Sequence, residues 1–215
     1  MPAVVPVPQP PAPTLLSDDL RVSFHGRVVL HLQTFKALPG EIWHVIGANG
    51  AGKTTLLRAL SGELACEGQV SICGTRPGTV AARRASLFVP TEADLIPDLC
   101  VRESLQFMAA AWEREAQPLL DLTHAFGLAS VLDLWPEELS RGTRQKVALS
   151  AALGLALPLT LLDEPFATLD VRSREVLREA IGTRAQSGGA VIVTTHGDEL
   201  SALNVRTLTL GAVPV

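Results

Sequence analysis

Residues 47–55 read GANGAGKTT and fit the pattern G-x-x-x-x-G-K-[ST]. The apolar stretch IWHVI precedes them and the helix-like stretch LLRAL follows, which is the strand–loop–helix context that the pattern requires. Glycines let backbone N–H groups turn inward around phosphate oxygens, so Lys53 would contact the β- and γ-phosphates of a nucleotide and Thr54 would offer its hydroxyl to Mg²⁺. A glycine-rich turn that holds a lysine by chance is a poorer explanation, because the chain has only three lysines. The candidate phosphate-binding residues are Gly47, Asn49, Gly50, Ala51, Gly52, Lys53, Thr54 and Thr55.

The stretch LTLLDEP places two carboxylates, Asp163 and Glu164, directly after an apolar run typical of a buried strand. Open α/β sheets bind ligands at the carboxyl ends of their strands. Asp163 would hold Mg²⁺ through its water shell, and Glu164 could polarise the attacking water. Many strands end in an acidic turn, so this pattern gains its force from the phosphate loop that precedes it.

A third stretch, LSRGTRQK at residues 139–146, lies just ahead of the apolar run VALSAALGLAL. Ser140 is a suitable N-cap for a helix that starts here. The same geometry, exposed N–H groups at the positive end of a helix dipole, also forms an anion-binding site. The residues alone leave both interpretations open.

The composition is that of an ordinary globular protein of one large domain, or one domain with an inserted subdomain. Of 215 residues, 47% are hydrophobic and 19% charged, and the formal net charge is −4 with a pI of about 5.7. No basic patch is present, so we expect no nucleic acid partner. The three cysteines form no CxxC pair, which favours a reducing compartment.

No stretch of the sequence suits a membrane span. The uncharged stretch at residues 147–162 contains Pro158 and is shorter than the ~20 apolar residues that a spanning helix needs. The N-terminal stretch MPAVVPVPQPPAP lacks the basic start and apolar core of a signal peptide. We predict that residues 1–14 form a disordered, proline-rich tail, passive or, as the alternative, a partner-binding arm.

Apolar strands alternate with helices along the rest of the chain. We predict two early strands within residues 20–32 with a turn at His25–Gly26, then the strand IWHVI and a helix that ends at Gly62. Further strands are predicted at QVSIC, SLFV, LTLL and AVIVTT, with one or two more in VRTLTLGAVPV. Helices are predicted for residues 101–116 and 117–134, broken by Pro118 and Gly127, and for the stretch REVLREAIGTRAQ. This order predicts an α/β fold with a parallel sheet and a helical insertion.

Together these motifs resemble those of the ATP-binding cassette (ABC) family over residues 18–211. GANGAGKTT resembles its Walker A motif, LLDEP its Walker B motif and LSRGTRQK its signature motif, usually LSGGQ. ATLD at residues 167–170 resembles the D-loop, and TTH at residues 194–196 the switch histidine. The resemblance implies a P-loop NTPase core with an antiparallel β-subdomain in residues 15–90 and 141–215, and an inserted helical subdomain in residues 91–140.

The resemblance also implies roles for residues outside the phosphate loop. In the family two cassettes meet head to tail around two ATP molecules, so Ser140 and Gly142 would face the γ-phosphate bound by the partner chain. His196 would fix the attacking water; as an isolated residue it would be an ordinary histidine at a strand end. Asp170 would act across the interface, or cap the next helix, or both. Phe24 would stack on adenine, or else pack within a strand pair.

Three positions depart from the family pattern. Arg141 replaces a glycine, and Thr143 replaces a glutamine whose side chain reaches farther. Thr91 stands where relatives carry a glutamine that senses Mg²⁺ and water, and its shorter side chain could require a bridging water. We therefore expect reduced or differently coupled hydrolysis.

The resemblance implies an ATPase subunit that drives transport by separate transmembrane permease subunits, which would dock between Thr91 and Ser140. It would be cytoplasmic and peripheral on the membrane. The chain continues for only 19 residues after His196, so we expect no appended regulatory domain and favour export slightly. The alternatives are a soluble ABC ATPase acting on nucleic acid or the ribosome, and a low-turnover regulatory module. The sequence does not identify the transported substrate or distinguish a homodimer from a heterodimer.

Overall fold

The computed structural model of the chain describes residues 11–211. Residues 1–10 of the predicted tail and the last four residues of the predicted terminal strands therefore lie outside the described residues. Thr14, which the sequence assigns to the tail, is buried. Its N–H donates to Ala37 O at 2.9 Å, and its carbonyl accepts from Cys73 N at 2.8 Å. Thr14, directly before the first strand, is thus hydrogen-bonded to the protein core and does not belong to a disordered tail.

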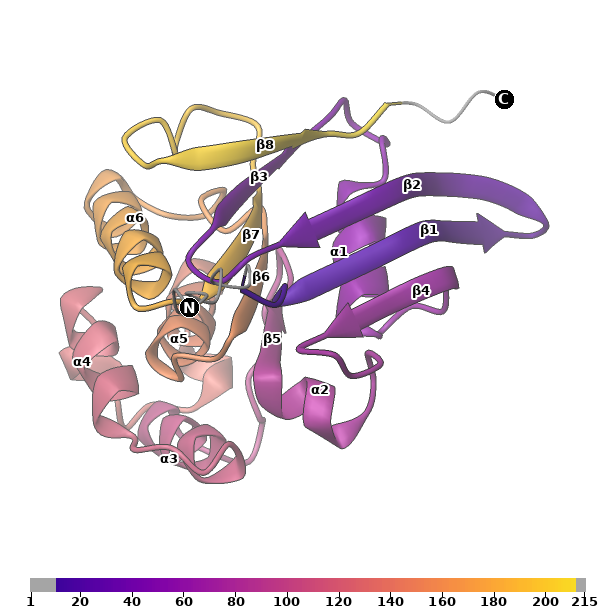
Figure 1. Ribbon diagram of the computed structural model, residues 1–215. Helices are drawn as coiled ribbons and strands as arrows, with labels where there is room; N and C mark the ends of the chain where they lie inside the picture. Colours follow the sequence, from indigo (N-terminus) through magenta and orange to yellow (C-terminus); the bar gives the residue numbers. More distant parts are fainter. Residues whose placement is uncertain (1–10, 212–215) are drawn as a thin grey trace, which may run out of the picture.

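A five-stranded parallel sheet forms the centre of the molecule (Figure 1). Its strands, in spatial order, are β5 (Ser86–Val89), β6 (Leu159–Asp163), β7 (Ala190–Thr194), β3 (Ile42–Ile46) and β8 (Val205–Thr209). Every residue of β6 and β7 is buried, which explains why both read as unbroken apolar runs. Asp163 is in register with Thr194 at the carboxyl ends of these neighbouring strands.

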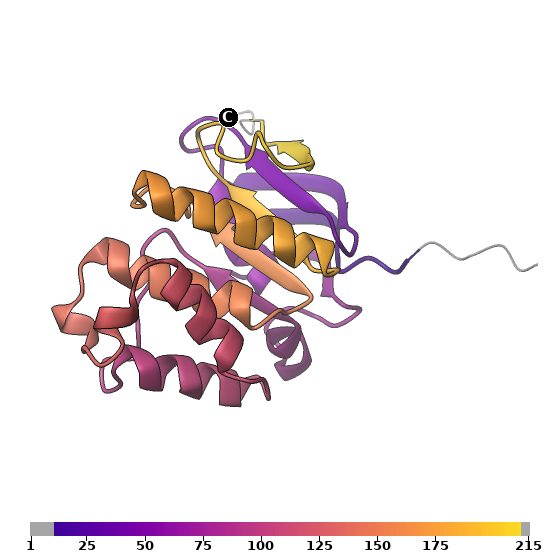
Figure 2. The ribbon, with the colours of Figure 1, turned by 90° about the vertical axis from the view of Figure 1, so that its left-hand side faces the viewer.

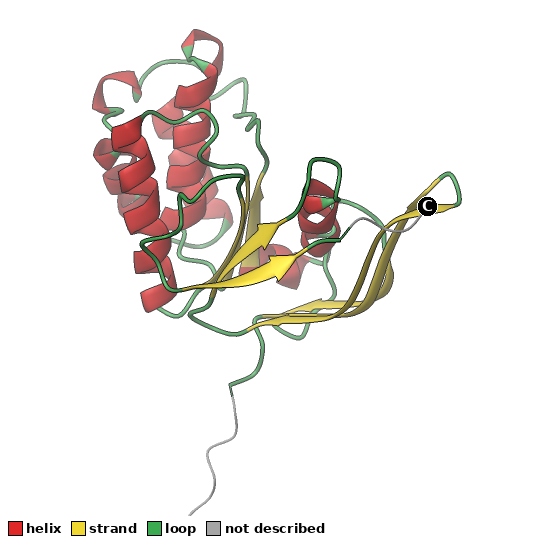
Figure 3. Cartoon of the chain, turned by 90° about the horizontal axis from the view of Figure 1, so that it is seen from above, coloured by secondary structure: helices red, strands yellow, loops and turns green. Residues whose placement is uncertain are grey.

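An antiparallel sheet of three strands packs beside the parallel one, as the resemblance implied (Figure 3). The strand order is β2 (Arg27–Ala37), β1 (Leu15–Phe24) and β4 (Glu67–Ile72). The predicted turn at His25–Gly26 joins β1 to β2, and both turn residues have positive φ, 50° and 76°.

Helices cover both faces of the parallel sheet. Helix α1 (Lys53–Ser61) lies between the two sheets and ends at Gly62, as predicted. Helices α5 (Arg141–Gly154) and α6 (Val171–Gln186) pack on the opposite face (Figure 2). The remaining helices are α2 (Val80–Ala85), α3 (Val101–Ala111), α4 (Gln117–Ala125) and two 3₁₀ turns (Ala129–Val131 and Pro136–Glu138). None of the helices between residues 11 and 211 has the length and apolar character needed to cross a bilayer.

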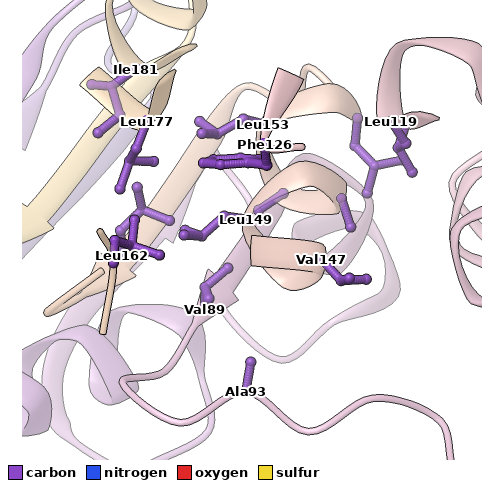
Figure 4. Packing of buried hydrophobic residues seen from close by; sticks show 14 of the residues in the cluster. Val89, Ala93, Leu119, Phe126, Val147, Leu149, Leu153, Leu162, Leu177 and Ile181 are labelled. Carbon is purple, nitrogen blue, oxygen red and sulfur yellow. The ribbon is translucent and has the colours of Figure 1, made fainter. Parts of the chain in front are cut away.

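The predicted helical insertion contains α3 and α4, and one apolar core joins it to the sheet (Figure 4). Phe126 of the insertion belongs to the same cluster as Leu162 of β6 and Leu177 of α6. Gly154 of α5 approaches α4 closely, since an added Cβ would lie 2.8 Å from Leu119 Cα. Because α5 contacts α3 and α4 as well as β5 and α6, it connects the insertion to the core.

The helices of this region differ in detail from the sequence prediction. The helix predicted for residues 101–116 ends at Ala111, because Glu113 takes a left-handed conformation (φ 55°). Pro118 lies in the first turn of α4, where no N–H partner is needed, and does not break it. The sequence analysis missed α2, which is a helix of only six residues.

Candidate functional site

The phosphate loop connects β3 to α1 and has the geometry of an anion cradle. Gly50 and Gly52 take left-handed conformations, with φ of 81° and 92°, which glycine adopts without strain. Gly52 caps α1 without a side chain, so the first N–H groups of this helix receive no side-chain acceptor. In contrast, α5 and α6 are capped by the side chains of Ser140 and Asp170. The α1 N-terminus is therefore open to phosphate oxygens.

Lys53 lies over this loop. Its side chain is only 8% exposed, and its ammonium group donates to Gly47 O at 3.0 Å. A bound phosphate would replace this neutral carbonyl with a charged acceptor, which forms the stronger hydrogen bond. The hydrogen bond to the loop therefore holds the Lys53 ammonium group beside the position where the phosphates would lie.

Three threonine hydroxyls converge on the buried carboxylate of Asp163. Thr54 donates to Oδ2 at 2.8 Å, Thr91 donates to the same oxygen at 3.1 Å, and Thr194 donates to Oδ1 at 2.7 Å. These hydroxyls come from α1, from the segment after β5 and from the end of β7. The three residues predicted for the metal are thus brought together, and Thr91 reaches the aspartate directly.

The donor set around Asp163 fits Mg²⁺. It consists of one carboxylate and hydroxyl oxygens, the hard ligands that Mg²⁺ prefers, and such sites usually complete the shell with phosphate oxygens and water. Within residues 11–211 no group of three or more His, Cys, Asp or Glu side chains could hold a metal ion without such help. The residues therefore suit a Mg²⁺ ion that arrives with nucleotide phosphates.

Glu164 and His196 form a second pair beside Asp163. The His196 Nε2 atom lies 3.1 Å from Glu164 Oε1, and Glu164 Oε1 is buried without a hydrogen bond from the described residues. Glu164 takes a left-handed conformation (φ 47°), held by hydrogen bonds from its N–H to the Thr194 hydroxyl at 2.9 Å and carbonyl at 3.2 Å. Burial raises the pKa of Glu164, and the nearby His196 and Lys53 oppose that rise. A raised pKa suits a general base.

The start of α5 confirms that Ser140 is the N-cap of this helix. Anion binding at the same helix end stays a prediction. Ser140 Oγ accepts from Thr143 N at 3.2 Å, and the two hydroxyl oxygens lie 2.8 Å apart. Gly142 approaches the following loop, because an added Cβ would lie 3.1 Å from Thr168 O.

The capping alternative for Asp170 is confirmed. Its carboxylate accepts from Ser173 N at 2.9 Å at the start of α6, and from Lys146 Nζ at 2.7 Å. These hydrogen bonds, with that from Lys146 first, hold the pKa of Asp170 below its usual range. A role across a dimer interface stays a prediction.

Phe24 lies at the end of β1, where it pairs with Arg27 of β2, and it is 45% exposed, so the strand pair covers only part of the ring. The hairpin of β1 and β2, which has Phe24 next to its turn, passes beside the phosphate loop. An added Cβ on Gly52 of that loop would lie 3.5 Å from Leu30 Cδ1 of β2. Contact between Phe24 and adenine stays a prediction.

The sequence analysis missed residues that join the motifs to one another. Thr194 bridges Asp163 and Glu164. Gln145 bonds the backbone on both sides of Thr91, and Lys146 bonds Asp170. Glu199 accepts from the Thr195 hydroxyl at 2.7 Å, just after the switch histidine. The available signal was their position next to a motif at a strand end or helix start.

Comparisons with known proteins identify the family. The family model described as "ABC transporter" matches residues 30–167. The cytochrome c biogenesis ATP-binding export protein of Rhodopseudomonas palustris (strain BisB5) is 36% identical over 85% of this chain and 91% of its own length. The hemin import ATP-binding protein of Streptomyces coelicolor is 36% identical over 92% of this chain and 75% of its own length.

Solved structures give the same result. A structure titled "Structure of ATP binding subunit of ABC transporter" superposes with a TM-score of 0.80 at 31% identity, covering 85% of this chain and 79% of the other. A putative ABC transporter ATP-binding protein from Pyrococcus furiosus superposes with a TM-score of 0.76 at 26% identity, covering 91% and 96%. These relatives fit the main prediction and not a soluble ATPase acting on nucleic acid or the ribosome. The chain belongs to the ABC transporter family, in which it is an ATP-binding subunit that hydrolyses ATP.

Proposed function

We propose that two cassettes close head to tail around two Mg-ATP molecules, with each phosphate loop facing the α5 N-terminus of the other cassette. The observation that carries this proposal is the meeting of the α1 N-terminus, the Thr54–Asp163–Thr91 group and the Glu164–His196 pair at one edge of the parallel sheet. Ser140 is exposed and supports the same arrangement, because its helix N-terminus is accessible to a second chain.

The residues divide the chemistry among them. Lys53 and the backbone N–H groups after Gly52 would bind the β- and γ-phosphates, and the charge that develops there would be stabilised by these fixed donors. Mg²⁺, held by Thr54, Thr91 and Asp163, would supply further charge neutralisation on the phosphate oxygens. Glu164 would take the proton of the attacking water, because Oε1 is a buried carboxylate oxygen that accepts no well-aligned hydrogen bond from residues 11–211 and has only His196 Nε2 nearby, at 3.1 Å. His196, beside that oxygen, would orient the same water.

Separate membrane subunits would be driven by this cycle, from a peripheral position on the cytoplasmic face. We propose that they dock where the helical insertion meets the core, and we extend the predicted docking region to a groove of about 610 Å³ between α1, α2, β5 and the end of α3. Trp112 of the insertion lines it, and Val80 of α2, 71% exposed, gives it an apolar rim. Export is the direction we favour, as the name of the Rhodopseudomonas relative says of that protein. The Streptomyces relative is named an import protein.

Light scattering after size exclusion tests the dimer. The Glu164→Gln variant should stay dimeric with Mg-ATP and be monomeric without it, because ATP binding is retained while hydrolysis stops. Adding Ser140→Arg should leave ATP affinity intact and abolish the dimer, since only the partner-facing helix end is altered. A Glu164→Gln protein that binds Mg-ATP tightly and stays monomeric at all concentrations would contradict the proposal.

A further inference from the structure

Helix α5 holds the segment that carries Thr91. The Gln145 side chain, only 2% exposed, reaches from the second turn of α5 to the backbone on either side of that threonine. Its Oε1 accepts from Ala93 N at 3.1 Å, and its Nε2 donates to Pro90 O at 3.1 Å. Because the oxygen and the nitrogen of this buried amide are both hydrogen-bonded to the segment, a shift of Gln145 would move the segment or leave buried polar groups unpaired.

An ion pair reinforces this contact at the surface. Arg141 lies one turn before Gln145 on the same face of α5, and its guanidinium is 2.8 Å from Glu92 Oε1. Both side chains are exposed, so their pair contributes less than the buried amide. The segment is therefore held to α5 on both sides of Thr91, with Gln145 as the main contact.

The neighbouring face of α5 holds the other loop of the site. Lys146 bonds Asp170 at 2.7 Å, and Gly142 lies against Thr168 O. The first two turns of α5 thus contact the Thr91 segment with one face and the loop before α6 with the next. A rigid helix with two such faces moves both loops together.

We propose that Gln145 is a positioning residue that keeps the Thr91 hydroxyl at Asp163, so that the Mg²⁺ requirement of ATP binding depends on the orientation of α5. This inference rests on the proposed function, in which Thr91 and Asp163 hold Mg²⁺ and the α5 N-terminus meets the partner's ATP. Any contact that tilts α5 would then change the metal site in the same chain. The Gln145 side chain is the physical link between the two.

The test is a double-mutant cycle on Mg²⁺-dependent ATP binding. Four proteins, all carrying Glu164→Gln to prevent turnover, would be titrated with Mg²⁺ at fixed ATP by calorimetry: no further change, Thr91→Val, Gln145→Met, and both. Each single change should raise the half-saturating Mg²⁺ concentration about fivefold, the effect of one lost hydrogen bond. The double variant should also show about fivefold, because the two residues act through one interaction.

The outcomes separate the two claims. If Thr91→Val leaves the Mg²⁺ requirement unchanged, the proposed metal role of Thr91 fails. If Thr91→Val raises it and Gln145→Met does not, or if the double variant shows the about 25-fold increase of independent effects, the inference about Gln145 is overturned while the metal role stands. Gln117→Met, on the α4 surface, is the matched control and should behave as the parent protein.

Hydrogen exchange tests the contact itself without metal or nucleotide. In the otherwise unchanged chain the Ala93 amide should exchange slowly, because its N–H is bonded to Gln145. Gln145→Met should speed this exchange at least about tenfold, the opening expected when one buried hydrogen bond is lost, and Thr91→Val should not. Fast exchange of Ala93 in the unchanged chain would refute the inference even if Gln145→Met fails to fold.

Discussion

Two buried threonines in neighbouring strands should respond oppositely to the same substitution. Thr160 of β6 and Thr194 of β7 are both 0% exposed, and valine has nearly the same shape as threonine and suits a strand. The Thr194 hydroxyl donates to the Asp163 carboxylate at 2.7 Å. The Thr160 hydroxyl has no hydrogen-bond partner among the described residues. The two variants therefore isolate the energy of one hydrogen bond to a buried charge.

The magnitudes follow from these contacts. Thr194→Val removes a hydrogen bond to a charged group and should lower the free energy of unfolding by about 1.5–3 kcal/mol. The Glu164 N–H keeps Thr194 O as an acceptor at 3.2 Å, so no backbone donor adds to this loss. Thr160→Val removes an unpaired buried hydroxyl and should raise the free energy of unfolding by about 1 kcal/mol. For a chain of this size, each 1 kcal/mol corresponds to about 2–4 °C in Tm.

Urea unfolding followed by circular dichroism, without metal or nucleotide, measures both variants against the parent protein. The transition slopes should stay equal, which would show that the denatured states are comparable. If Thr160→Val destabilises the protein as much as Thr194→Val, the buried hydroxyls are not distinguished by their partners. That result would refute the assigned hydrogen bonds around Asp163.

Three further predictions concern the nucleotide site. The kcat/KM of hydrolysis should fall as pH decreases through the raised pKa of Glu164, at a pH above the ordinary glutamate value of about 4.3, because the protonated carboxyl cannot act as a base. A limb at or below that value in a pH–kcat/KM profile would contradict the general-base role. Lys53→Met should weaken ATP binding about tenfold to hundredfold in calorimetry, since a charge-assisted contact is lost, while Lys36→Met on exposed β2 should not. Gly142→Ala should lower kcat about tenfold with little change in Tm, because its Cβ would lie 3.1 Å from Thr168 O in the loop before α6. A large fall in Tm would indicate general damage to the fold instead.

Much of the fold and the main motifs could be predicted from the sequence because they depend on local patterns. The phosphate loop is marked by its own glycines, and the buried strands β6 and β7 by unbroken apolar runs. Ser140 and Asp170 were predicted as helix caps because capping needs only a side chain three positions before its N–H partner.

The contacts that connect these motifs could not be predicted, because they depend on which segments become neighbours. The bond from Thr194 to Asp163 requires the pairing of β6 with β7, and Gln145 reaches a segment more than fifty positions earlier in the chain. Neither residue type is unusual for its place in a strand or a helix. The early end of α3 is likewise set by a left-handed Glu113, a conformation for which the sequence carries no signal.

The most direct test of the central claim, that each ATP is hydrolysed between two cassettes, is the rate of ATP hydrolysis against protein concentration at saturating Mg-ATP. Composite sites require association, so the specific rate per chain should rise with concentration before it levels off, and Glu164→Gln should abolish it throughout. A specific rate that is independent of concentration, from a protein shown to be monomeric by light scattering, would place the complete site within one chain and contradict the account.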